Sequence, residues 1–114
     1  MDMATTEQTL IPRPSDRIIC FKVGKVRREN LYEMTRKYWV VNPRRALKAT
    51  HALAVINGIV QAVYIPYRWY PTEDVTRIGR YEFDGEEDQL SEYIGKSVQE
   101  FYGKSQNPIK YINM

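Results

Sequence analysis

The sequence predicts an α+β domain in which a small, strongly bent five-stranded sheet, or a partly closed β-barrel, is flanked by two helices. Five short segments are rich in apolar and β-branched residues and are separated by turn residues, which is the pattern of strands. Two other segments space their apolar residues at helical intervals. A chain of 114 residues is long enough for one core, so we expect a single folded domain.

The first 16 residues are expected to be a flexible N-terminal segment, because Pro12 and Pro14 disfavour regular structure, and the domain is expected at residues 17–114. This segment does not show a basic start followed by an apolar run, so no signal peptide is expected. No apolar stretch reaches the roughly 18 residues of a membrane span. With a single cysteine, Cys20, the expected location is the reducing cytoplasm.

The first predicted strand is the apolar run at residues 17–23. The segment ENLYEMTRKYW, residues 29–39, then repeats apolar residues at helical spacing, with Asn30 in position to cap the first turn. The helix should end before Asn42-Pro43, because the residue before a proline is pushed out of the helical region. A short turn follows at residues 44–50.

The strongest local pattern is HALAVINGIVQAVYI, residues 51–65, in which two apolar runs flank Asn57-Gly58. This dipeptide favours a two-residue hairpin turn, and the continuous apolar runs predict a hairpin covered on both faces. Residues 79–85 alternate apolar and polar side chains and predict another strand. Residues 88–103 predict a second helix, and NPIKYINM, residues 107–114, predicts the last strand.

Positive charge is concentrated in one part of the chain. Residues 13–48 contain eleven Lys and Arg against three Asp and Glu, whereas residues 49–114 contain six against nine. This asymmetry predicts a basic face, and a basic face favours polyanionic partners such as nucleic acid or nucleotides. The alternative is a solvated basic surface that has no partner.

No residue pattern predicts catalysis, a metal site or a cofactor. The two GKS tripeptides lack the glycine that a phosphate-binding P-loop places five positions before its Gly-Lys. The acidic run EFDGEEDQ, residues 82–89, lacks the ligand spacing of an EF-hand. His51 is the only histidine, so a zinc site is not expected. We therefore expect a binding protein rather than an enzyme.

Two clusters of aromatic and basic residues remain. TRKYW, residues 35–39, ends the first helix, and IPYRWYP, residues 65–71, ends the second strand of the hairpin. If Trp39 and Trp69 form one wall, their rings can stack nucleobases while nearby arginines bind phosphate. The alternative is that both rings close the open ends of a small barrel.

Residues 22–114 resemble the PUA-like superfamily, which includes EVE, YTH and ASCH domains. The resemblance rests on the order of the elements, on HALAVINGIVQAVYIPYRWYPTED, residues 51–74, and on RYEFDG, residues 80–85. The chain looks like a compact bacterial or phage relative in which QNPIKYIN, residues 106–113, makes the last strand.

The resemblance implies binding of RNA or DNA, because PUA-like domains bind nucleic acids and several branches flip a modified base into an aromatic pocket. It implies that two tryptophan rings stack the base, two tyrosines border the pocket and four arginines contact phosphate. The expected ligand-binding residues are Arg36, Tyr38, Trp39, Arg44, Arg45, Trp69, Arg80 and Tyr81.

Three alternative functions remain open at this point. The same rings and arginines could enclose a small nucleotide, such as a signalling nucleotide, in a closed pocket. An ASCH-like ribonuclease would use Lys22 and Lys25 as its early basic residues. A protein-protein interaction domain would pair its apolar edge with a partner chain.

Overall fold

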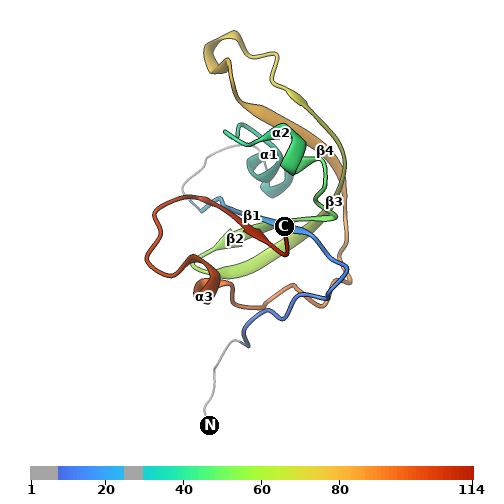
Figure 1. Ribbon diagram of the computed structural model, residues 1–114, viewed down its shortest axis with the longest axis vertical. Coiled ribbons are helices and arrows are strands. Elements are labelled where there is room, and N and C mark those ends of the chain that lie inside the picture. The colour runs from blue at the N-terminus through green and yellow to red at the C-terminus, as the bar shows by residue number, and fades with distance from the viewer. Residues whose placement is uncertain (1–7, 25–29) are drawn as a thin grey trace.

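The computed structural model describes residues 8–24 and 30–114 and places them around one five-stranded sheet (Figure 1). The strands are β1 (Ile18–Lys22), β2 (His51–Ile56), β3 (Ile59–Pro71), β4 (Tyr81–Glu87) and β5 (Ile109–Ile112). The helices are α1 (Leu31–Arg36), α2 (Pro43–Ala46), α3 (Gln99–Tyr102) and the 3-10 turn η1 (Val75–Arg77).

The order of strands in the sheet is β4-β3-β2-β1-β5. β1 and β2 are parallel, and the other neighbouring pairs are antiparallel. The expected α+β fold with five strands is confirmed, but the sheet is mixed and open, because β4 and β5 form its two separate edges.

The hairpin at Asn57-Gly58 is confirmed. Asn57 has a φ of 53° and Gly58 a φ of 78°, the positive values that a two-residue turn of this kind requires. Along β2 the buried side chains of Ala54 and Val55 point to opposite faces of the sheet and join different groups of core residues. The expectation that the hairpin is covered on both faces is therefore also confirmed.

Two groups of buried side chains lie on the two faces of the sheet. On one face Phe21 and Phe83 pack beneath α1 and α2. On the other face Leu53 packs with Val98, which lies just before α3, and with Tyr102 of α3. Figure 1 shows these two layers on either side of β1 and β2.

The expected helix at residues 88–103 is wrong. Only its end is helical, as α3, and the residues before it form turns. Tyr93 and Val98 are buried, but Leu90 is 95% exposed, so the apolar spacing does not produce one buried stripe.

Hydrogen bonds within turns and to the sheet explain why this segment is not a helix. The Ser91 hydroxyl accepts a bond from the N–H of Tyr93 at 3.2 Å, a local contact that competes with helical pairing. Gly95 has a φ of 86°, and its N–H donates to the carbonyl of Val60 on β3 at 2.8 Å. Val60 in turn donates to the carbonyl of Lys96 at 2.9 Å, so the sheet uses the main-chain groups of this segment.

The first helix begins where expected and ends early. The Asn30 side chain accepts a bond from the N–H of Glu33 at 2.9 Å, which confirms the cap. The helix stops at Arg36 because the chain then runs beside β4, where Trp39 and Tyr81 exchange main-chain bonds of 3.0 and 2.8 Å. With α2 as an additional turn, the described residues contain three short α-helices rather than two. None of these helices is long and apolar enough to cross a membrane.

Residues 8–16 pack with the domain. Leu10 is buried among the core residues near α3, and its N–H donates to the carbonyl of Ser97 at 2.8 Å. The N–H of Ser97 donates to the carbonyl of Gln8 at the same distance. The packed chain thus includes residues before position 17, while residues 1–7 of the expected flexible segment lie outside the described residues.

Cys20 lies on β1 and is fully buried. Burial raises the pKa of its thiol to about 12, because the surroundings disfavour the charged thiolate. The thiol is therefore neutral near pH 7 and contributes packing rather than nucleophilic chemistry.

Candidate functional site

Trp39 belongs to the core rather than to an open surface. Its ring stacks on Phe21 with 4.5 Å between the centroids, and its Nε1 donates to the carbonyl of Thr35 at 2.7 Å. Only 7% of the residue is exposed. Base stacking needs an open ring face, so this geometry does not support the expected role of Trp39.

Trp69 joins the same aromatic cluster. Its ring lies 5.0 Å from that of Phe83 and 6.3 Å from that of Phe21, and its buried Nε1 has no hydrogen-bond partner in the described residues. Tyr81 is half-buried against the same cluster. The structure therefore brings Trp39, Trp69 and Tyr81 together in one largely internal cluster. An edge of Trp39 lines a hollow at the hairpin turn, but Trp69 and Tyr81 do not line that hollow, so the two tryptophans do not form one open wall.

Arg36 is the last residue of α1 and is 9% exposed. Its side chain reaches β4. Its guanidinium forms ion pairs of 3.2, 3.1 and 2.9 Å with Glu33, Glu82 and Asp84, which we call the Arg36 cluster, and its Nε donates to the carbonyl of Phe83. Burial lowers the pKa of Arg36, but the hydrogen bond to Asp84 and the surrounding negative charges raise it by more. These partners occupy the guanidinium, so it is not placed to bind a phosphate.

Arg80 is the last residue of the loop that joins β3 and β4, and Tyr38 lies next to this loop. The Arg77 guanidinium lies 4.4 Å from the centroid of the Tyr38 ring, and Arg80 donates to the Tyr38 carbonyl at 3.1 Å. The adjacent hollow is lined by Glu73 and Asp74 as well as by basic side chains. This surface carries charges of both signs, which weakens its attraction for a polyanion.

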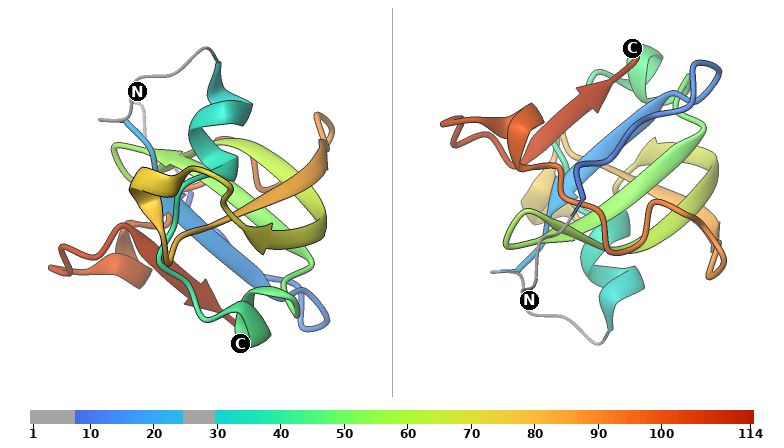
Figure 2. Two further views of the ribbon diagram at one scale, coloured as in Figure 1. Left: turned by 90° about the horizontal axis from the view of Figure 1, so that it is seen from above. Right: turned by 90° about the horizontal axis from the view of Figure 1, so that it is seen from below.

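Arg44 and Arg45 are exposed on α2, and Arg45 lines a pocket of about 450 Å³. We call this the basic pocket; its lining residues are Arg17, Arg45, Lys48, Asn113 and Met114. They come from the segment before β1, from α2 and the turn after it, and from the segment after β5. Figure 2 shows how these parts meet, with the C-terminal end of the chain beside α2.

Within the described residues, no Asp or Glu side chain pairs with the three cations of the basic pocket, and Arg45 contacts a main-chain oxygen of Met114. No Asp or Glu lines the pocket. Within the described residues, Arg17, Arg45 and Lys48 take part in no ion pair, and the ion pairs that form involve other basic residues. Three like charges that converge without compensation favour the binding of an anion between them.

The α2 side of the pocket is held in place by its own hydrogen bonds. The Asn42 side chain caps the helix by accepting a bond from the N–H of Arg45 at 3.3 Å, and Pro43 occupies the first turn. The Arg45 guanidinium lies over the Tyr111 ring at 3.9 Å and donates to the main-chain oxygen of Met114 at 3.3 Å. The orientation of this guanidinium is therefore fixed before any ligand binds.

The opposite side of the pocket is fixed by contacts across the sheet. The N–H of Arg17 donates to the Thr50 hydroxyl at 2.9 Å, and this hydroxyl donates back to the Arg17 carbonyl at 3.1 Å. The Asn113 side chain donates to the carbonyls of Arg13 and Asp16, both at 3.1 Å. These bonds tie the segment before β1 to β2 and to the end of β5, which preorganises the pocket.

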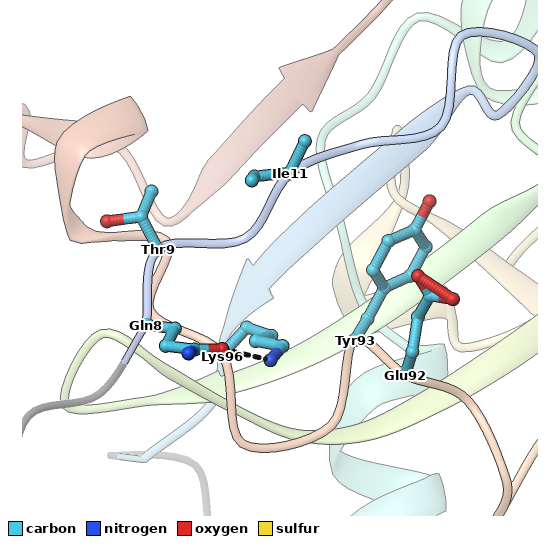
Figure 3. Close-up of a pocket in the computed structure, with 6 residues that line it drawn as sticks. All are labelled: Gln8, Thr9, Ile11, Glu92, Tyr93 and Lys96. Atoms are coloured by element: carbon cyan, nitrogen blue, oxygen red, sulfur yellow. Dashed lines mark hydrogen bonds between the residues drawn. The ribbon is translucent and has the colours of Figure 1, made fainter.

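A larger groove, of about 510 Å³, lies between residues 8–11 and 92–96 (Figure 3). Its basic residue, Lys96, donates to the side-chain oxygen of Gln8 at 2.8 Å. Its carboxylate, Glu92, forms an ion pair with Arg13. Both charged groups are engaged, so the groove has no excess charge to select a ligand.

A hollow of about 550 Å³ at the hairpin turn is lined, among the described residues, by one basic side chain, Lys22, and by Trp39. Lys22 donates to the carbonyl of Ser105 at 3.3 Å and lies over the Tyr102 ring at 4.3 Å. These contacts resemble those of Arg45, so this hollow differs from the basic pocket in having one cation rather than three. Lys25, the other basic residue of the ribonuclease alternative, lies outside the described residues. Nothing in this hollow adds support for catalysis.

Residues 8–24 and 30–114 contain no group of three His, Cys, Asp or Glu side chains that could hold a metal ion. No protein-family model, curated protein or solved structure matches the chain. The choice of site therefore depends on the geometry and charge of the pockets themselves, and these favour the basic pocket.

The sequence identified part of this pocket. Arg45 was expected to bind phosphate, and Arg44 lies beside the pocket on the same helix. Arg17, Lys48 and Asn113 were missed. The three-residue spacing from Arg45 to Lys48 is a signal that places both side chains on one side of a helical turn. Arg17 carries no such signal, because only the pairing of β1 with β2 and β5 brings it to α2.

Proposed function

We propose that the protein binds nucleic acid through phosphate groups at the basic pocket. The observation that carries this proposal is the convergence of Arg17, Arg45 and Lys48 on one hollow that has no acidic residue. Lys and Arg supply most of the electrostatic affinity of proteins for nucleic acid. Arg44, exposed on the same helix as Arg45, provides a contact for a neighbouring phosphate.

The chemistry of the pocket suits phosphate better than a base. Guanidinium groups form paired, charge-assisted hydrogen bonds with phosphate oxygens. The Tyr111 ring is covered by the Arg45 guanidinium, so it does not offer that face to a base. Contacts to phosphate fix the position of a strand without reading its sequence. The proposed function is therefore binding with little sequence preference, and stacking of a flipped base on Trp39 and Trp69 is not part of it.

We also propose that the α+β domain has a PUA-like fold. An open five-stranded sheet with helices on its faces is compatible with a PUA-like domain. Nucleic-acid binding is the function that such a domain would be expected to have.

Binding through phosphate groups should weaken as the salt concentration rises. The three cations of the basic pocket neutralise about three phosphate charges of a single strand, which gives a slope of about −2 for the logarithm of the binding constant against that of the salt concentration. We expect the affinity of a labelled single-stranded oligonucleotide to fall about 20-fold between roughly 50 and 200 mM salt. Fluorescence anisotropy measures both values. Binding that does not change with salt would contradict the proposed function.

The Arg45→Gln variant locates the contact. It should weaken binding about fivefold to tenfold at the lower salt concentration and make the slope shallower by about 0.7. Arg77→Gln is the matched control, because it removes the same charge from an exposed arginine that pairs with Asp74 outside the basic pocket. If both variants weaken binding equally, the interaction depends on net charge and not on this pocket.

A further inference from the structure

The basic pocket gathers three cations around one hollow. Arg17 lies before β1, whereas Arg45 and Lys48 lie on α2 and the turn after it, and all three line a single hollow. A protein that follows a nucleic-acid backbone needs a row of cations, because each nucleotide carries one phosphodiester charge. Cations that converge on one hollow suit one compact group that carries more than one negative charge.

The surroundings of the pocket also oppose a strand that would run through it. The pocket is separated by the segment before β1 from a smaller hollow, of about 160 Å³, which is lined by Asp16, Asp88 and Glu92. The basic residue in that hollow, Arg13, is paired with Glu92. A backbone leaving the basic pocket on this side would meet these carboxylates, which disfavours a strand that passes through the pocket in this direction.

We infer that the basic pocket holds the terminal phosphate monoester of a nucleic-acid strand. The inference depends on the proposed function, because it names the part of the nucleic acid that the same site binds. A terminal monoester carries a charge of about −1.5 to −2 near pH 7, whereas an internal diester carries one negative charge. Three uncompensated cations distinguish these two groups by charge.

The size and rigidity of the pocket agree with such a ligand. A volume of about 450 Å³ lies within the range of about 300 to 1,000 Å³ for ligand pockets, so the phosphate can enter together with its sugar. The Arg45 guanidinium is held by Tyr111 and Met114, and the Arg17 backbone is held by Thr50. Groups that are already fixed lose little conformational freedom on binding, which favours a small, highly charged ligand.

The test compares matched single strands of about ten nucleotides by fluorescence anisotropy. One pair carries a 3′ dye and either a 5′ phosphate or a 5′ hydroxyl, and the other carries a 5′ dye and either a 3′ phosphate or a 3′ hydroxyl. For one of these two pairs, we expect the phosphorylated strand to bind about tenfold more tightly than its hydroxyl counterpart near pH 7.5. The preference should decrease near pH 5, because the monoester loses its second charge with a pKa of about 6 while the Arg and Lys side chains stay charged.

Arg45→Gln and Lys48→Gln should each reduce the preference to about threefold or less, and Arg77→Gln should leave it unchanged. Equal binding of phosphorylated and hydroxyl strands, with loss of both in Arg45→Gln, would overturn the inference and leave the proposed function intact. Binding of neither strand would overturn both. A nucleoside monophosphate that competes as strongly as the phosphorylated strand would overturn the assignment to a strand end. Circular dichroism and thermal melting of Arg45→Gln, Lys48→Gln and Arg77→Gln test whether each variant is folded.

Discussion

Replacing Trp39 with alanine is expected to lower the free energy of unfolding by about 4 kcal/mol, within the range for large aromatic residues in protein cores. The ring is 7% exposed, stacks on Phe21, and donates from Nε1 to the Thr35 carbonyl. Its loss leaves a cavity in the aromatic cluster and an unpaired carbonyl. Most domains of this size are stable by about 5–15 kcal/mol, so the expected loss is a large fraction.

Urea unfolding followed by far-ultraviolet circular dichroism measures this change without relying on tryptophan fluorescence. Trp69→Phe is the matched control. It keeps an aromatic ring next to Phe83 and removes a buried Nε1 that has no partner within the described chain, so its effect should be below about 1 kcal/mol. An unchanged midpoint for Trp39→Ala would show that its ring is not packed as described and would restore it as a candidate ligand contact.

The second large effect is expected for Arg36→Met. This change keeps an unbranched side chain that replaces the aliphatic part of Arg36, but it leaves the side chains of Glu82 and Asp84, which are 12% and 28% exposed, without the guanidinium. Removing one member of a buried ion pair costs about 3–5 kcal/mol, and the partial exposure of Asp84 reduces this to about 2–3 kcal/mol. Thermal unfolding should shift downward by about 10 °C. Arg36→Lys should lose less stability than Arg36→Met, because it keeps the positive charge. It should still be less stable than the wild type, because lysine lacks the forked geometry of the guanidinium.

The stability of Arg36→Met should depend less on pH than the stability of the wild type. Burial acts to raise the pKa of Glu33, but its hydrogen bond to Lys37 and the charge of Arg36 lower it below the ordinary value. A lowered folded-state pKa contributes stability above the unfolded value of about 4.3, and this stability is lost as the pH falls through the lower folded value. Without Arg36 the contribution is smaller. The stability difference between wild type and Arg36→Met should therefore be greatest near pH 7 and decrease below about pH 4; a difference that grows on acidification would contradict this account.

The strands were predictable because their signals are local. The Asn57-Gly58 turn and the apolar runs on either side define the central hairpin, and the alternation at residues 79–85 indicates β4. The helix expected at residues 88–103 was not formed, because main-chain groups at Gly95 and Lys96 bond to Val60 on β3. These bonds connect distant parts of the chain, and helical spacing does not reveal them.

The candidate site was less predictable for the same reason. Residue type indicated that Arg36 and Arg45 were both available for phosphate, but tertiary contacts give them opposite roles. Arg36 meets three carboxylates in the Arg36 cluster, whereas Arg45 lies over Tyr111 and faces a pocket without carboxylates. Only the folded chain shows which of two similar arginines pairs with Asp and Glu side chains and which does not. The two tryptophans likewise gather as expected, yet the orientation of their rings places them in the core.

The most direct test of the central claim is a titration of isotope-labelled protein with a single-stranded oligonucleotide, followed by two-dimensional NMR of amide and indole N–H groups. Binding at the basic pocket predicts that the largest chemical-shift changes occur at residues 16–17, 44–48 and 111–114. The indole signals of Trp39 and Trp69 should change little, because Trp39 is buried in the core, Trp69 is partly buried against it, and neither lines the basic pocket. Changes centred on the two indoles and on Tyr38, or no changes at all, would contradict the proposal that phosphate is bound at the basic pocket.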